Sequence, residues 1–280
     1  MSFSNFHTHS YFCDGHGDPE EYVNSAIQYN FTCLGFSSHA PLPFPNSWTM
    51  KESSVNKYLS TILHLRKKYE NKIQIYLGLE IDYITDLISP TDEKFKNMKL
   101  NYTIGSVHML KNETTCKYLA VDGDEDEYIE LITSAFHNDV KAFVHSYYEQ
   151  IRKMVEEKTP SIVGHLDLIK KHNKNSKYFD ESEKWYKDEI IATLKVISQH
   201  NTILEMNTGG KVRGYTDDFY PSNWILPECK ELNIPMILNS DAHNPQYVNA
   251  YFDEATAILK AAEYEDQHIL LDNIWQTTAL

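Results

Sequence analysis

Short apolar runs, typical of buried strands, alternate along this chain with stretches whose apolar residues recur at helical spacing. The strand-like runs are residues 31–38, 73–81, 100–107, 161–164, 202–206 and 234–238, and an extended segment around residues 6–9 precedes them. The helical stretches are residues 18–27, 54–69, 127–136, 140–157, 181–198, 221–232 and 252–262, and we expect the last of them to close the chain. This alternation predicts right-handed βαβ units, and hence an α/β fold with a parallel sheet of about seven strands.

Polar residues of the kinds that bind metals stand at the ends of these runs. They are His7, His9, His39, Glu80, His108, His165, Asp241 and His243. His7 and His9 are two residues apart, so both side chains project to the same side of an extended segment. A (β/α) barrel gathers the carboxyl ends of all its strands at one mouth, whereas a doubly wound open sheet brings only two or three loops to one crevice. We therefore predict a single TIM-like barrel domain that spans residues 1–280.

The composition narrows the class of protein. A chain of 280 residues with 41% hydrophobic and 24% charged residues is ordinary for a globular protein. The net charge of −14 argues against a nucleic-acid partner, and it means that any phosphate site must be made locally attractive, for example by metal cations. The four widely spaced cysteines fit free thiols in a reducing compartment, and the sequence shows neither a leader nor an apolar run of membrane-spanning length. We expect a cytoplasmic protein with no membrane partner, and the oligomeric state stays open.

The residues at the strand ends indicate a metal centre with more than one ion. Sets that mix imidazole and carboxylate favour zinc, iron or manganese over calcium or magnesium. The candidate ligands exceed the four of one tetrahedral site, and a carboxylate can bridge two ions. Clustered ions suit phosphoester hydrolysis, in which one ion holds a hydroxide while the others hold phosphoryl oxygens.

A family resemblance is carried by six segments, which follow one another along the chain. They are His7-Thr8-His9, Ser38-His39-Ala40-Pro41-Leu42-Pro43, Glu80, Gly105-Ser106-Val107-His108, Gly164-His165-Leu166-Asp167 and Ser240-Asp241-Ala242-His243. They resemble the successive motifs of the polymerase and histidinol phosphatase (PHP) family. The segments around His39, His108 and His165, with Asn207-Thr208-Gly209 and Tyr220-Pro221-Ser222, are similar to its histidinol-phosphate phosphatase branch in particular.

The resemblance implies a distorted seven-stranded (β/α) barrel with three divalent metal ions, of zinc, iron or manganese. It assigns the first ion to His7, His9, Glu80 and Asp241. The second ion would take Glu80 as a bridging ligand, with His108 and His165. The third would take His39 and His243, with one ligand from the loop after His9.

This sequence departs from the family pattern in two places. Where the family usually has a histidine or an acid in the loop after His9, Gly15 stands at the nearest spacing, so the ligand is either His16, which we prefer, or Asp14. Ser38 stands where related proteins commonly carry an acid before the histidine. That change alters either a contact behind the ligands or the amine end of the substrate site.

The resemblance also suggests which groups handle the phosphate. Arg213 follows the sixth strand-like run, where the similar branch keeps a basic residue, and Lys211 is the alternative. A guanidinium can hold two phosphoryl oxygens at once. In the predicted reaction a metal-bridging hydroxide attacks phosphorus beside Glu80, and Asp241, His243 or both manage the proton at the leaving oxygen.

The function that the resemblance implies is hydrolysis of L-histidinol phosphate to L-histidinol and phosphate, a step of histidine biosynthesis. A second interpretation is a hydrolase of the same family that acts on another phosphomonoester, a nucleotide or DNA ends, although the acidic charge argues against DNA. A third is a non-enzymatic metal-binding or regulatory module, against which the nearly complete ligand set argues.

Overall fold

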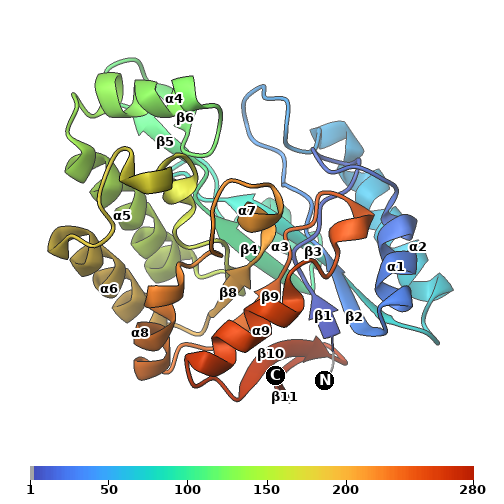
Figure 1. Ribbon diagram of the computed structural model, residues 1–280. Helices are drawn as coiled ribbons and strands as arrows, with labels where there is room; N and C mark the ends of the chain where they lie inside the picture. The colour runs from blue at the N-terminus through green and yellow to red at the C-terminus, as the bar shows by residue number, and fades with distance from the viewer. Residues whose placement is uncertain (1–2) are drawn as a thin grey trace.

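The computed structural model describes residues 3–280, and its centre is a sheet of seven parallel strands in the order β1-β2-β3-β4-β7-β8-β9 (Figure 1). The strands are β1 (Phe3–Asn5), β2 (Phe31–Phe36), β3 (Gln74–Asp82), β4 (Tyr102–Ser106), β7 (Ile162–Val163), β8 (Ile203–Asn207) and β9 (Met236–Asn239). Each successive strand of this sheet lies beside the previous one, as expected when each returns through a crossover connection.

The two edges of the sheet meet at the carboxyl end of the strands. Thr8, just after β1, forms a parallel bridge with Ala242, just after β9. The His9 N–H donates to the Ala242 carbonyl at 2.9 Å, and the Ala242 N–H donates to the His7 carbonyl at 3.2 Å. The sheet is thus nearly closed into a barrel, which confirms the predicted seven-stranded α/β architecture.

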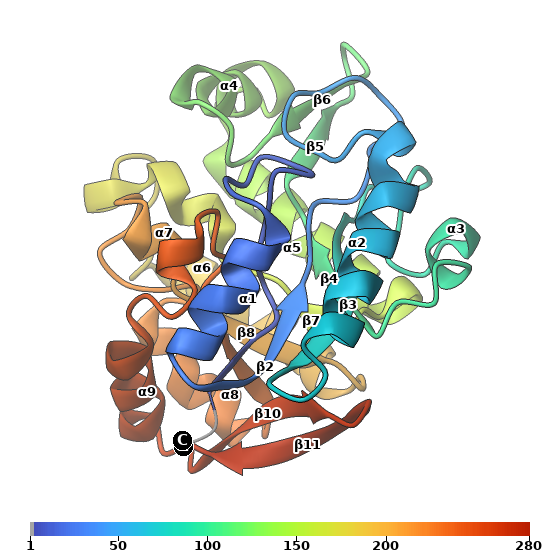
Figure 2. The same ribbon diagram turned by 90° about the vertical axis from the view of Figure 1, so that its right-hand side faces the viewer.

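Helices surround this barrel, with α1 and α2 on one side and α5 and α6 on the opposite side (Figures 1 and 2). The helices are α1 (Pro19–Gln28), α2 (Val55–Lys68), α3 (Glu93–Lys96), α4 (Glu125–Glu130), α5 (Val140–Lys158), α6 (Lys184–Ser198), α7 (Gly209–Val212), α8 (Leu226–Glu231) and α9 (Phe252–Ala261). The first helix begins as its sequence indicates, because Asp18 and Glu21 form a reciprocal capping box around Pro19. In residues 3–280 no helix is long and apolar enough to cross a membrane.

The interior of the barrel is a separate apolar cluster, filled by side chains from every strand. Its members include Phe6, Cys33, Tyr76, Tyr102, Ile104, Ile162, Ile203 and Ile237. Because side chains along a strand alternate between two faces, residues two or four positions further on from these also face the interior, one layer nearer the mouth. Buried polar residues at such positions are Glu80, Ser106, Glu205 and Asn239.

Two antiparallel hairpins were not predicted. β5 (Met109–Asn112) and β6 (Lys117–Ala120) lie at one end of the barrel, and β10 (Asp266–Leu271) and β11 (Ile274–Ala279) lie at the other (Figures 1 and 2). The prediction that a helix closes the chain is therefore wrong. Ile269 and Leu270 of β10 pack on the interior cluster, so this hairpin covers the apolar end of the barrel that the helices leave open.

Two smaller departures concern the segment after β8. The predicted helix over residues 221–232 begins later, with a short 3₁₀ turn at Asn223–Ile225 and then α8, because Ser222 has a non-helical backbone with ψ of 142°. The segment after Thr208, where the sequence shows no helical run, contains the single-turn helix α7.

Candidate metal centre

The predicted ligands converge at the mouth where the two sheet edges meet. His7 and His9 lie on either side of the Thr8 bridge, and Glu80 lies near the carboxyl end of β3. The other five, His39, His108, His165, Asp241 and His243, follow the carboxyl ends of β2, β4, β7 and β9. Glu80 is 1% exposed and lies in the middle of the set.

A first group of ligand atoms surrounds one oxygen of Glu80. The Glu80 Oε2 atom lies 3.1 Å from His7 Nε2 and 3.4 Å from His9 Nε2. The Asp241 Oδ1 atom closes the group, at 3.6 Å from His7 Nε2 and 3.1 Å from His9 Nε2. These are the four residues that the resemblance assigned to the first ion.

A second group surrounds the other oxygen of the same carboxylate. The Glu80 Oε1 atom lies 2.9 Å from His165 Nε2 and 3.4 Å from His108 Nε2, and the two imidazole nitrogens are 3.2 Å apart. Ser106 donates a hydrogen bond of 2.6 Å to the same oxygen. Glu80 therefore has one oxygen in each group, which is the arrangement a bridging carboxylate requires.

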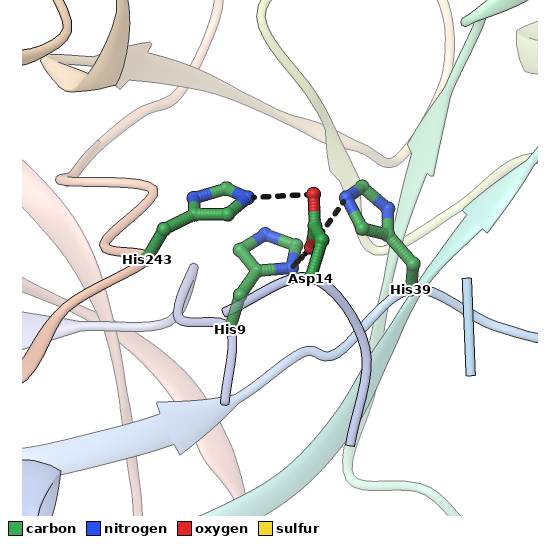
Figure 3. Close-up of side chains that lie close together, drawn as sticks. All are labelled: His9, Asp14, His39 and His243. Atoms are coloured by element: carbon green, nitrogen blue, oxygen red, sulfur yellow. Dashed lines mark ion pairs between the residues drawn. The ribbon is translucent and has the colours of Figure 1, made fainter. Parts of the chain in front are cut away.

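A third group contains His9, Asp14, His39 and His243 (Figure 3). The Asp14 carboxylate lies among the three rings, at 3.3 Å from His243 Nε2, 3.7 Å from His39 Nε2 and 3.9 Å from His9 Nδ1.

The geometry favours Asp14 over His16 as the ligand from this loop. His16 lines the cavity but belongs to none of the groups of possible metal ligands among residues 3–280. Its backbone N–H donates to the His243 carbonyl at 2.7 Å. Gly15 packs so tightly on the His9 backbone that a Cβ atom there would lie 2.3 Å from the His9 carbonyl carbon. A histidine or an acid therefore does not fit at position 15, and Asp14, one position earlier, supplies the carboxylate instead.

The donor atoms fit metal ions better than they fit hydrogen bonds to one another. His9 Nε2 and His39 Nδ1 are buried and have no hydrogen-bond partner in the described part of the chain, although each lies near a carboxylate oxygen. An unpaired buried nitrogen is costly unless another partner satisfies it. This mixture of imidazole nitrogens and carboxylate oxygens can hold divalent metal ions.

The electrostatics point the same way. Burial alone would raise the pKa of Glu80, but His39, His7 and His108 hold that pKa well below its usual range. Burial lowers the pKa of His108, and the Asp82 and Glu80 carboxylates outweigh it, raising the pKa to about 10. Burial, with His243 and His39 nearby, lowers the pKa of His9 to about 3. The ionised carboxylates attract positive charge, so a divalent ion that binds here competes with the proton on imidazoles such as His108.

Two carboxylates that sequence reasoning did not assign a role lie directly behind the ligands. The Asp82 Oδ1 atom lies 2.9 Å from His108 Nδ1, and the Glu205 Oε2 atom lies 2.9 Å from His7 Nδ1. Both are buried. Asp82 follows Glu80 by two positions and Glu205 follows the interior residue Ile203 by two, so the period of a strand would have placed both acids inside the barrel.

Of the two basic residues predicted to bind phosphate, only one lies at the cavity. Arg213 lines the cavity, where its guanidinium donates to Asp241 Oδ2 at 2.8 Å and its Nη1 atom lies 2.9 Å from His243 Nδ1. Lys211 forms an ion pair with Glu254 and is not among the residues that line the cavity. Ser38 is buried, and its hydroxyl lies 3.5 Å from that of Ser10, behind the ligands.

The cavity over these groups has a volume of about 690 Å³. Its outer wall is aromatic on one side, with Phe44, Trp48 and Tyr118, and carries the carboxylates of Asp122 and Glu127 on another. The Trp48 ring meets the His39 ring edge-on, with centroids 4.7 Å apart, and Phe44 stacks on Tyr118 at 5.5 Å. The unpredicted β5–β6 hairpin therefore supplies part of this wall.

The model of one protein family, described as the PHP domain, matches residues 5–209. This match covers more than half of the chain and includes most of the ligand-bearing strand ends.

The chain belongs to the PHP domain family.

Relatives of this PHP chain agree with that assignment. A histidinol-phosphatase of Bacillus subtilis (strain 168) is 30% identical over 257 residues, which cover 85% of this chain and 92% of the relative. A solved chain from Listeria monocytogenes superimposes with a TM-score of 0.76 at 23% identity, covering 90% of this chain and 99% of that one. The histidinol phosphate phosphatase of Lactococcus lactis, solved in complex with zinc, L-histidinol and phosphate, gives a TM-score of 0.71 at 20% identity and covers 98% of both chains. These two structures support the fold.

Proposed function

We propose that this chain is a metal-dependent phosphomonoesterase that hydrolyses L-histidinol phosphate to L-histidinol and phosphate. The observation that carries the proposal is the set of overlapping groups of possible metal ligands, two of which contain Glu80, in a chain 30% identical to a histidinol-phosphatase over most of its length. Such a reaction belongs to histidine biosynthesis, and the whole chain of residues 1–280 acts as one catalytic unit.

The ligand groups account for three divalent ions, of zinc, iron or manganese. The first group is His7, His9, Glu80 and Asp241, the second is Glu80, His108 and His165, and the third is Asp14, His39 and His243. When bound, the ions supply Lewis acidity toward the phosphoryl oxygens and the attacking water.

The chain's own groups bind the phosphate and move the proton. The Arg213 guanidinium lies at the edge of the ligand groups, where it can donate to two phosphoryl oxygens. Asp241 and His243 line the cavity beside it, so they are the two groups placed to carry a proton to the leaving oxygen. His243 can do so only when its Nε2 atom is not a metal ligand, because a ligating nitrogen has no free lone pair.

The outer wall of the cavity fits the rest of the substrate. Phe44, Trp48 and Tyr118 offer ring faces and edges for an imidazole, and Asp122 offers a carboxylate for the ammonium group. The Asp122 carboxylate accepts no hydrogen bond from any residue in 3–280, whereas Glu127 accepts one from the Ala120 N–H at 2.7 Å. A nucleotide, the main alternative substrate, would place additional negative charge against this acidic wall, so we favour the cationic amino alcohol phosphate.

The location that we propose is the cytoplasm. All four cysteines are free thiols, which fits a reducing compartment. Small-molecule phosphate esters are the proposed partners, and the net charge of −14 disfavours nucleic acid.

The test is phosphate release from histidinol phosphate and from a panel of sugar, nucleotide and aryl phosphates. We expect a clear preference for histidinol phosphate that the Asp122→Asn variant lowers about tenfold or more, since one charge-assisted contact contributes about 1.5–3 kcal/mol. The Asp126→Asn variant is the matched control, because Asp126 is exposed in the first turn of α4, four residues further on, and does not line the cavity. Equal rates across the panel would still support a phosphatase activity, but they would refute histidinol phosphate as the preferred substrate.

A further inference from the structure

Glu205 is a fully buried carboxylate in the otherwise apolar strand β8. It has the same alternation as Ile203, so it points into the barrel directly below the ligand groups. A buried charge in such a place requires partners for its lone pairs. Glu205 has four, and they come from four different elements around the mouth.

Each oxygen of Glu205 accepts two hydrogen bonds of 2.9 Å or less, and His7 Nδ1 also lies 3.2 Å from Oε1. Oε1 accepts from the backbone N–H of His165 at 2.7 Å and from Asn207 Nδ2 at 2.8 Å. Oε2 accepts from His7 Nδ1 at 2.9 Å and from Asn239 Nδ2 at 2.9 Å. One carboxylate thus contacts a residue of the first ligand group through its side chain and a residue of the second group through its backbone.

The contact with His7 determines which nitrogen can bind a metal. An ionised carboxylate only accepts hydrogen bonds, so the His7 Nδ1 atom must carry the proton. The lone pair is then on Nε2, which faces Glu80 Oε2 at 3.1 Å and Asp241 Oδ1 at 3.6 Å. The contact with the His165 N–H fixes the main chain of the residue whose Nε2 lies 2.9 Å from Glu80 Oε1.

The two asparagine amides cannot rotate to suit a different side chain at this position. The Asn207 Oδ1 atom already accepts from the Gly209 N–H at 2.8 Å, and the Asn239 Oδ1 atom accepts from the Phe6 N–H at 2.8 Å. Both NH₂ groups are therefore held toward Glu205. The two amides and the His165 N–H can face the carboxylate only as donors, and His7 can become an acceptor only by moving its proton to Nε2.

We propose that Glu205 is a positioning residue that sets the geometry of two adjacent metal-ligand groups together, through the tautomer of His7 and the backbone of His165. This inference rests on the proposed function, because it takes those groups to be metal ligands. Within residues 3–280, no hydrogen bond joins Glu205 to Asp14, His39 or His243, so Glu205 makes no direct contact with these residues of the third group.

The test measures metal binding in the absence of substrate. The Glu205→Gln variant keeps the shape but replaces one acceptor oxygen with an NH₂ donor, which must face two donors. If the NH₂ group faces His7, the imidazole has to move its proton to Nε2 and loses its ligating lone pair. Metal-free protein is titrated with zinc, the ions per chain are counted, and the zinc-induced rise in Tm is recorded for each variant.

We expect the Glu205→Gln variant to bind the ions of the first two groups about 10–100-fold more weakly while it retains the third. The Asp92→Asn variant is the control, since Asp92 accepts two hydrogen bonds from Ser89 and neither lines the cavity nor belongs to a ligand group; it should lower the metal-free Tm and leave the zinc-induced rise unchanged. A merely structural Glu205 would behave as Asp92 does.

The outcomes distinguish this inference from the proposed function. Wild-type protein that binds neither zinc nor manganese nor iron would refute the proposed function itself. Wild-type protein that binds zinc, with a Glu205→Gln variant of equal stoichiometry and affinity, would overturn the role of Glu205 alone. If the Gln variant does not fold, Glu205→Asp replaces it, because the shorter carboxylate cannot reach both His7 and the His165 N–H; wild-type zinc affinity in that variant would also overturn the inference.

Discussion

Replacing Arg213 by methionine removes the one guanidinium among the residues that line the described cavity. Its Nη2 atom donates to Asp241 Oδ2 at 2.8 Å, and its Nη1 atom lies near the Asp241 carbonyl and His243 Nδ1. His243 Nδ1 lies 3.0 Å from the same carbonyl, so it can donate there when Nε2 binds a metal. Arg213 would then be released from His243 and free to contact phosphate.

The magnitude follows from the contacts that would be lost. A charge-assisted hydrogen bond contributes about 1.5–3 kcal/mol, and a guanidinium can make two of them to one phosphoryl group. Because about 1.4 kcal/mol corresponds to a factor of ten, Arg213→Met should lower kcat/KM by roughly 10²–10³-fold. Arg213→Lys keeps the charge but not the paired donors, so it should lose only about tenfold.

The assay is steady-state phosphate release from histidinol phosphate, with the metal content counted in the same samples. Lys211→Met is the matched control, since Lys211 pairs with Glu254 away from the cavity, and we expect less than a twofold change, roughly the effect of losing a surface ion pair. The metal content of Arg213→Met should stay at the wild-type level because Arg213 is not a ligand. A larger loss in the Lys211 variant than in the Arg213 variant would refute the assignment.

Two further predictions concern the loop after His9 and a half-buried acid that does not line the cavity. Asp14→Asn should release the ion of the third group, whereas His16→Gln should retain all ions; metal counting after gel filtration measures both, and the opposite pattern would restore His16 as the ligand. Burial raises the pKa of Glu181, so ionising this acid opposes folding increasingly as the pH rises through that raised pKa. Glu181→Gln should therefore raise the Tm at neutral pH and lose this gain near pH ~4, where the wild-type acid is protonated; a gain of equal size at both pH values would contradict the argument.

The parallel strands could be predicted because each is a short apolar run followed by a polar residue. The apolar run at 100–107 indicates a buried strand and His108 marks its carboxyl end, and the same holds for the run at 31–38 and His39. Seven such units restrict the topology to very few arrangements, because the crossover handedness is fixed.

The hairpins escaped prediction for different reasons. β5 and β6 have four residues each, which is too short for alternation to stand out from a loop. β10 and β11 had a usable signal, since Asp272 and Asn273 form a two-residue turn with φ of 50° and 62°. Asp and Asn tolerate this left-handed conformation, and it is the one that a tight hairpin requires.

The ligand groups were easier to predict than the residues behind them. A histidine at a strand end is conspicuous in sequence, whereas Glu205 lies within an apolar strand, where only the period of two shows that it faces the interior. The choice between Asp14 and His16 depends on how Gly15 packs against the His9 backbone, and no one-dimensional pattern contains that contact.

Histidinol phosphate hydrolysis before and after metal removal tests the central claim most directly. Protein purified without chelator should release phosphate, lose this activity when its ions are removed, and regain it when zinc or manganese is returned, in proportion to the ions bound per chain. Undiminished turnover by fully metal-free protein would contradict the account, as would an absence of turnover when all three ligand groups are occupied.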